Sequence, residues 1–252
     1  NTIEAGSDAD VISLSGGNNT VFGGSGTDSI TASNGTNVID AGTEDDTITA
    51  SGGTNTITAG DGNDAITLNN GINSLVAGSG ADTITAASGV NTIDTGDDDD
   101  VITLNNGTNN VYGGSGLDSI TASGGTNTID AGVNNDTINL NNGTNSVIAG
   151  TGADTITALS GLNTIDGGDG ADVINLSGGD NTVFGASGAD SITATAGRNV
   201  VNTGADDDII HLSNGTNSVI AGVGADTITA TNGTNTIEAG SDADVISLSG
   251  GN

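Results

Sequence analysis

The sequence predicts an all-β fold: a two-sheet parallel β-roll (a β-solenoid) with 18 residues per turn and about 14 turns. Three observations predict it. An aspartate recurs every 18 residues from Asp10 to Asp244, and an asparagine does so up to Asn235, both without exception. An isoleucine stands two residues after each aspartate, from Ile12 to Ile246. A period this strict indicates one small structural unit that stacks on itself.

Each 18-residue turn contains two short predicted strands. Val11–Leu14 follows Asp10 and Thr20–Gly23 follows Asn19, and both alternate around a central aliphatic residue, as short strands do. The segments between them are rich in Gly, Asn, Ser and Asp, which favour turns. Because the aliphatic residues recur every nine residues, the pattern favours two sheets over the three hexapeptide faces of a left-handed triangular β-helix.

The predicted core is thin. Each turn directs inward one Ile, one Ile, Val or Leu, and a small residue such as Ala5 or Gly23. A fourth inward position alternates between Leu and Ala in most neighbouring turns, as at Leu68 and Ala86, so that large and small side chains interleave. Such a core predicts that a further interaction stabilises the turns.

The chain is predicted to be a single continuous solenoid over residues 1–252. Residues 1–18 recur identically at 235–252, an offset of 234 residues. We interpret the sequence as one 234-residue block plus one turn of a longer tandem-repeat parent protein.

The charge of the chain excludes several classes of partner. There are 32 acidic residues against one basic residue, Arg198, which gives a net charge of −31. Such a balance is typical of disorder, but the strict period argues against disorder here. Nucleic acid and anionic membrane would be repelled, and no apolar run approaches the ~18 residues of a membrane span. The charge favours cations as partners.

The aspartate column is the predicted metal site, and its metal is predicted to be Ca²⁺. Strands in adjacent turns lie about 4.8 Å apart, so stacked carboxylates repel one another unless cations lie between them. Calcium takes about six to eight oxygen ligands, which carboxylates and turn carbonyls supply. An alternative is that the column caps the turns, with loosely held sodium as counterion. The predicted ligands are Asp10, Asp28, Asp46, Asp64, Asp82, Asp100, Asp118, Asp136, Asp154, Asp172, Asp190, Asp208, Asp226 and Asp244.

Several segments fit the nonapeptide G-G-x-G-x-D-x-U-x: Gly23–Thr31, Gly113–Thr121 and Gly167–Asn175, with its core at Gly60–Asp64 and Gly78–Asp82. The chain therefore resembles the RTX (repeats-in-toxin) calcium-binding nonapeptide-repeat proteins of the secreted structural, surface-fibre or adhesin type. The resemblance covers essentially the whole chain. It implies a β-roll with calcium between consecutive turns, held by the Asp carboxylates and the carbonyls of the Gly-rich turns.

The chain departs from the RTX pattern because every second nonapeptide has Asn in place of Asp. A neutral amide can hydrogen-bond its neighbours along the stack without a counterion, so a structural Asn ladder is predicted opposite the calcium edge. Its members are Asn19, Asn37, Asn55, Asn73, Asn91, Asn109, Asn127, Asn145, Asn163, Asn181, Asn199, Asn217 and Asn235. Six turns replace the second motif glycine and are expected to bind calcium differently or to add carboxylates: Asp8, Glu44, Asp98, Asn134, Asp206 and Asp242.

The two outer faces differ. After each Asp the outward residues are mostly Ser and Thr, as at Thr47 and Thr49, and ranks of this kind occur on ice-binding solenoids, although Val101 and His211 interrupt them. On the other face, large apolar residues alternate from Val76 to Glu238 with acids or, at Asn202, an amide, and regular apolar rows mark interfaces. The predicted lateral interface is Phe22, Val76, Tyr112, Ile148, Phe184 and Ile220.

The sequence predicts a protein that is not an enzyme. With one histidine and one basic side chain, neither a catalytic triad nor a histidine metal site can form. The predicted function is a structural module of a secreted, calcium-stabilised extracellular filament, adhesin stalk or surface layer, located outside the cell or on its surface. Its predicted partners are other solenoids, packed laterally or end to end, with a cell surface or polysaccharide as a further contact. The alternatives are an ice-binding solenoid and an RTX accessory module of a secreted enzyme or toxin.

Overall fold

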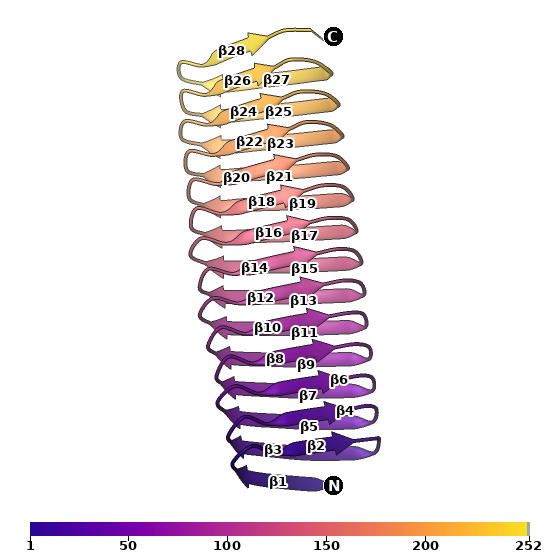
Figure 1. Cartoon of the computed structure of the whole chain (residues 1–252). Coiled ribbons are helices and arrows are strands. Elements are labelled where there is room, and N and C mark those ends of the chain that lie inside the picture. The colour runs from indigo at the N-terminus through magenta and orange to yellow at the C-terminus, as the bar shows by residue number, and fades with distance from the viewer. Residues whose placement is uncertain (251–252) are drawn as a thin grey trace. The chain divides into compact units, whose positions relative to one another are not determined.

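The computed structural model describes residues 1–250, which form two parallel sheets of 14 strands each. Each turn of the coil contributes one odd-numbered strand to one sheet and one even-numbered strand to the other (Figure 1). This confirms the predicted β-solenoid of about 14 turns with roughly 18 residues per turn. Within the described range, no helix is long and apolar enough to cross a membrane.

The strands of the first sheet are β1 (Thr2–Ser7), β3 (Asn18–Ser25), β5 (Thr36–Thr43), β7 (Thr54–Asp61), β9 (Ile72–Ser79), β11 (Val90–Asp97), β13 (Thr108–Ser115), β15 (Thr126–Val133), β17 (Thr144–Thr151), β19 (Leu162–Asp169), β21 (Asp180–Ser187), β23 (Arg198–Ala205), β25 (Thr216–Val223) and β27 (Thr234–Ser241). The strands of the second sheet are β2 (Val11–Leu14), β4 (Ser29–Ala32), β6 (Thr47–Ala50), β8 (Ala65–Leu68), β10 (Thr83–Ala86), β12 (Val101–Leu104), β14 (Ser119–Ala122), β16 (Thr137–Leu140), β18 (Thr155–Ala158), β20 (Val173–Leu176), β22 (Ser191–Ala194), β24 (Ile209–Leu212), β26 (Thr227–Ala230) and β28 (Val245–Leu248).

Neighbouring strands of a sheet pair in parallel at an offset of one turn. Ile84 of β10 is paired with Ile102 of β12, and Asn91 of β11 with Asn109 of β13. The offset equals the sequence period, so residues at the same position of successive turns stack into columns. Fold and sequence period therefore place the same residue types side by side along the solenoid.

The core lies between the two sheets and is made by the alternation of each strand. In β3 and β4 the inward positions are buried and the outward ones are exposed or half-buried. The chain divides into two compact units, Asn1–Ile129 and Asp130–Asn252. Ile30 and Ile39 are fully buried in the first, and Ile156 and Ile165 in the second. β-Branched residues suit these half-buried strands.

The strands of the second sheet have the predicted bounds, whereas those of the first sheet are longer than predicted. β2 is Val11–Leu14, as expected, but the expected strand Thr20–Gly23 is only the middle of the eight-residue β3. The extension has a structural cause: Gly24 and Ser25 continue to pair with the next turn, so the chain bends only after them. Ala86 pairs with both Leu68 and Leu104, so the predicted interleaving of large and small side chains is present.

Glycine is required where the backbone bends between the sheets. Gly35 has a φ of 96°, and a Cβ added there would collide with the carbonyl oxygen of Gly17 in the preceding turn. Positive φ is costly for other residues, and here the close approach of two backbones also forbids a side chain. Glycine at this position lets the turns stack at the spacing of the sheets.

Candidate metal centre

The aspartate column lies inside the solenoid. Each Asp directly precedes a strand of the second sheet, and alternation turns it inward because the first strand residue faces out and the second faces in. Asp28, Asp64 and Asp154 are at most 1% exposed, although the chain has almost no positive charge to pair with them. The column forms one end of the core, where the Gly-rich turn leads into the second sheet.

One carboxylate oxygen of most aspartates in the column accepts a hydrogen bond from the backbone. The N–H of Asp28 donates to Oδ1 of Asp46 (2.7 Å), and the N–H of Asp46 donates to Oδ1 of Asp64 (2.7 Å). In the second unit the N–H of Asp190 donates to Oδ1 of Asp208 (2.8 Å). Each of these carboxylates therefore binds the backbone of the turn that precedes its own.

The other carboxylate oxygen has no hydrogen-bond donor at most positions of the column. A buried polar atom without a partner costs about 1–3 kcal/mol, and more when it carries charge. A buried row of such oxygens can be stabilised only by protons or by cations. The oxygens in this state are Oδ2 of Asp10, Asp28, Asp46, Asp64, Asp82, Asp100, Asp154, Asp172, Asp190, Asp208 and Asp226.

The electrostatics of the column reflect this shortage of donors. Burial, reinforced by neighbouring carboxylates and partly offset by the backbone hydrogen bond, raises the pKa of Asp82 and Asp190 to about 7. Burial also raises the pKa of Asp46, Asp100 and Asp172 to about 6. Without a metal the column therefore tends to take up protons near neutral pH.

The space beside the column suits a hard cation. A Cβ added at Gly23 would collide with Oδ2 of Asp28 and with the carbonyl oxygen of Ala41 in the next turn. At Gly185 an added Cβ would likewise meet a carboxylate oxygen, that of Asp190, and a carbonyl oxygen of the next turn. A carboxylate oxygen and a carbonyl oxygen thus converge, and both only accept hydrogen bonds. Calcium prefers such oxygens, so the residues fit it.

Side chains alone do not complete a metal site. Among residues 1–250, no group of three or more His, Cys, Asp or Glu side chains is arranged to hold a metal ion. A cation at the aspartate column therefore requires main-chain carbonyl oxygens in addition to the carboxylates, as the convergence at Gly23 provides.

The asparagines form a hydrogen-bonded ladder at the other end of the core. Nδ2 of Asn37 donates to Oδ1 of Asn55 (2.8 Å) and to the carbonyl of Asn34 (3.2 Å). In the second unit, Nδ2 of Asn181 donates to Oδ1 of Asn199 (2.7 Å). An amide both donates and accepts, so this buried column satisfies itself without a counterion.

The turns with an acid or Asn in place of glycine keep the positive φ of glycine, as at Glu44 (73°). The Glu44 carboxylate accepts from the N–H of Gly26 in the preceding turn (2.8 Å), and Asp45 accepts from the N–H of Asn63 in the next (2.8 Å). Asp98–Asp99 make the same two kinds of contact. These side chains cap neighbouring backbone amides, and their contribution to calcium binding stays a prediction.

Two buried hydroxyl groups at the column were not predicted. Thr95 and Thr203 occupy the inward position that is Ala or Gly in every other turn, and both are fully buried. The hydroxyl of Thr95 donates to the carbonyl of Gly113 (2.5 Å), and that of Thr203 to the carbonyl of Ala221 (2.7 Å). Their departure from the Ala/Gly pattern was the signal in the sequence.

The outer faces present the predicted exposed residues. The six apolar side chains of the predicted lateral interface are between 41% and 50% exposed, and what covers them stays a prediction.

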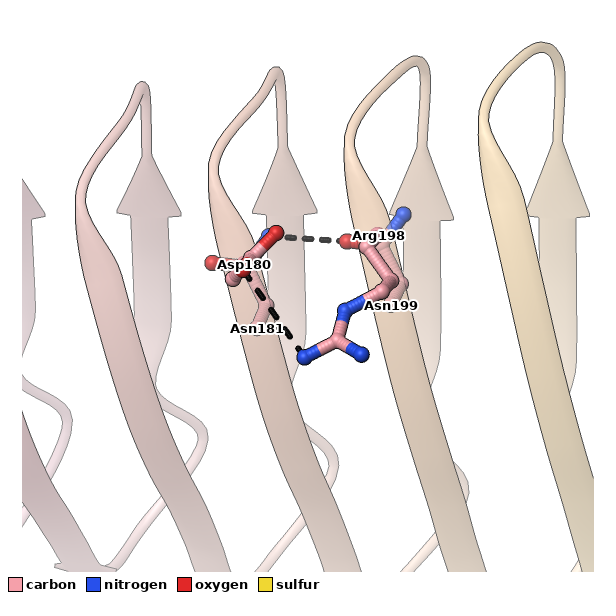
Figure 2. A network of polar contacts seen from close by, with 4 residues as sticks. All are labelled: Asp180, Asn181, Arg198 and Asn199. Atoms are coloured by element: carbon pink, nitrogen blue, oxygen red, sulfur yellow. Dashed lines mark hydrogen bonds and ion pairs between the residues drawn. The ribbon is translucent and has the colours of Figure 1, made fainter.

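Arg198 is the only lysine or arginine of the chain, and its Nη2 lies 3.8 Å from Oδ2 of Asp180 (Figure 2). Both side chains are more than half exposed, so the pair contributes little stability. Figure 2 shows it beside the Asn181–Asn199 link of the ladder.

Comparison with known proteins gives a family and a structural relative. The family model described as the RTX calcium-binding nonapeptide repeat (4 copies) matches residues 1–30, 31–66, 67–102, 103–138, 139–174, 148–183, 158–192, 184–219 and 220–252. No curated protein sequence matches the chain. A hyperactive, Ca²⁺-dependent, beta-helical antifreeze protein from an Antarctic bacterium has a similar structure, with a TM-score of 0.69 at 20% identity, covering 89% of this chain and 84% of that one.

Proposed function

Because the chain belongs to the RTX calcium-binding nonapeptide-repeat family, we propose that it is a structural module of a secreted, calcium-stabilised filament, adhesin stalk or surface layer. The match confirms the family and the predicted Ca²⁺. The observation that carries the proposal is the buried row of carboxylate oxygens without hydrogen-bond donors. Such a row costs stability by itself and becomes favourable when cations occupy it.

The proposed ligands are the carboxylates of the aspartate column together with carbonyls of the Gly-rich turns. At Gly23 these are Oδ2 of Asp28 and the carbonyl of Ala41, and at Gly185 they are Oδ2 of Asp190 and the carbonyl of Thr203. Bound calcium would supply the positive charge that these oxygens lack. Since the ligands come from successive turns, metal binding would be coupled to stacking of the turns and hence to folding.

Extracellular location follows from this coupling as part of the proposal. The calcium sites of extracellular modules commonly have dissociation constants of about 10⁻⁴–10⁻³ M. A chain that needs such a concentration to fold would remain unfolded where calcium is scarce and fold after export. The net charge of −31 would keep that unfolded chain extended.

A structural role rather than catalysis fits the chemistry of the side chains. The column repeats one carboxylate environment in turn after turn, whereas acid–base catalysis needs groups whose pKa values are set apart in one site. The single histidine, His211, lies on the outer face of β24, and Arg198 pairs with an exposed acid.

The calcium ligands can be tested with a matched pair of variants. Asp64→Asn places an amide in the buried column, whereas Asp40→Asn removes the same charge from an exposed position of β5. In a calorimetric titration, Asp64→Asn is expected to bind fewer calcium ions than the wild type, and Asp40→Asn the same number. Equal stoichiometry in all three proteins would show that the column is not the calcium site.

Lateral association is the proposed role of the exposed apolar row. Large apolar side chains repeating on one face favour contact with another solenoid. The triple variant Tyr112→Ser, Ile148→Ser, Phe184→Ser is expected to abolish concentration-dependent association in sedimentation, while circular dichroism in calcium stays that of the wild type. Association that survives the three substitutions rules out this face as the contact.

Ice binding is the second candidate function, since the structural relative named above is an antifreeze protein. The outward Thr residues of the second sheet, such as Thr47 on β6 and Thr83 on β10, offer a rank of hydroxyl and methyl groups. A thermal-hysteresis assay in calcium tests it directly. Thermal hysteresis in the wild type that is lost in the Thr47→Lys/Thr83→Lys variant would favour ice binding over the structural role. Absence of hysteresis in the wild type would rule out ice binding.

A further inference from the structure

The inward position five residues before each aspartate governs the space beside its carboxylate. It is occupied by Gly, Ala or Thr, as at Gly23, Ala41 and Thr95. At Gly23, the place where a Cβ would stand is bordered by Oδ2 of Asp28 and by the carbonyl of the next turn. Glycine therefore leaves the most room for a cation between the two oxygens. Alanine places its Cβ in that room, and threonine adds a methyl group and a hydroxyl to the Cβ.

A threonine fills this space and also satisfies one of the two oxygens. Thr95 is fully buried, and its hydroxyl donates to the carbonyl of Gly113 in the next turn. The hydroxyl also lies beside the Asp100 carboxylate, but its one proton is directed to the carbonyl, so Oδ2 of Asp100 has no donor of its own. The carbonyl is the oxygen that would otherwise be free to bind a cation.

The same arrangement occurs independently in the second unit. Thr203 is fully buried and donates to the carbonyl of Ala221. In the adjoining turn, Gly185 leaves room beside Asp190, and the carbonyl of Thr203 itself faces that room. We call the space beside each aspartate of the column a step. The open step at Gly185 and the filled step at Thr203 thus follow each other directly in the stack.

We infer that the steps at Thr95 and Thr203 bind calcium more weakly than the other steps of the aspartate column. Each hydroxyl occupies the metal's space and binds the carbonyl that calcium would use. The inference rests on the proposed function and sets an order within it: calcium occupies the glycine steps first, the alanine steps next and the threonine steps last. A calcium ion entering a threonine step must displace a buried hydrogen bond. We expect the affinity there to be about tenfold lower.

A calcium titration of the whole chain by calorimetry tests the order. Thr95→Ala/Thr203→Ala removes both hydroxyls and leaves the residue that most turns already carry at this position. The expected result is that two calcium equivalents move from the weak to the tight phase of the titration. Thr95→Ser/Thr203→Ser keeps the hydroxyls and is expected to titrate as the wild type.

A substitution in the opposite direction keeps the test informative if the Thr95→Ala/Thr203→Ala variant fails to fold. Ala41→Thr introduces a hydroxyl beside Asp46 and is expected to move one equivalent from the tight to the weak phase. An unchanged titration in both Ala41→Thr and the double Ala variant would overturn the inference while leaving the proposed function intact. Weaker binding in the double Ala variant would overturn it as well, since the hydroxyls would then be ligands. A wild type that binds no calcium would instead overturn the proposed function.

Discussion

The two buried polar columns differ by a single group at each residue, and that group decides what each column needs. Asn37 and Asn55 are linked by an amide that both donates and accepts, so the ladder needs no ion. Oδ1 of Asp46 accepts a hydrogen bond from a backbone N–H, but its Oδ2 has no hydrogen-bond donor. An amide column therefore stabilises the fold in any solution, whereas a carboxylate column stabilises it only with protons or cations.

The raised pKa values predict how the metal-free protein responds to pH. Burial raises the pKa of Asp82 and Asp190 from 3.8 to about 7, so the folded chain binds more protons than the unfolded chain between these values. In chelator, the free energy of unfolding is therefore expected to fall as pH rises from about 4 to about 7. Circular dichroism in chelator across this range measures it, since the β-signal is expected to be strongest near pH 4 and to be lost toward pH 7.

Calcium provides the control for the pH prediction. A bound cation requires deprotonated carboxylates, so at saturating calcium the stability lost on raising the pH should be abolished or reversed. A β-signal in chelator that rises between pH 4 and pH 7 would contradict the account of the column.

At the residue scale, the sequence predicted which side chains stack but not how each uses its oxygens. The 18-residue period identifies Asp46 and Asp64 as neighbours. It does not reveal that the N–H of Asp46 occupies Oδ1 of Asp64, because that depends on the side-chain rotamer and on the bend of the chain before the strand. Thr95 and Thr203 were missed because threonine in a strand ordinarily reads as an outward residue.

At the scale of the strands, the Asn ladder ties each strand of the first sheet to the next. Asn55→Ala would remove the donor to the buried Oδ1 of Asn73 and would leave Nδ2 of Asn37 with only the carbonyl of Asn34 as acceptor. The expected cost is about 1–3 kcal/mol in calcium. Asn34→Ala, an exposed turn position, is the control and should change stability little. Thermal denaturation of the two variants compares them, and equal melting temperatures would argue against the ladder as a stabilising element.

The strands themselves were largely predictable because their hydrophobic period is strict. The bounds of the second-sheet strands follow from the alternation after each aspartate, as in β2. The first-sheet strands extend further, because Gly24 and Ser25 pair with Gly42 and Thr43 through backbone groups that glycine exposes equally in turns and strands. Backbone pairing of this kind leaves no trace in side-chain hydrophobicity.

For the whole molecule, the dominant quantity is charge. The chain carries a net charge of −31, and its regularly stacked aspartates bring carboxylates together as soon as the turns form. Repulsion of this kind opposes the compact state. The thin aliphatic core stabilises the compact state only weakly. Calcium that binds only the folded chain shifts the balance by mass action. Folding and calcium binding are therefore expected to occur as one event.

The most direct test of this account is circular dichroism of the chain at neutral pH in chelator, followed by titration with calcium to millimolar concentration and with magnesium as the control ion. Magnesium demands a regular octahedral site and dehydrates reluctantly, so it should substitute poorly. The account predicts little β-structure in chelator and a cooperative gain of β-signal with calcium. A full β-signal in chelator that calcium leaves unchanged would contradict it, since the core and the Asn ladder would then suffice without the metal.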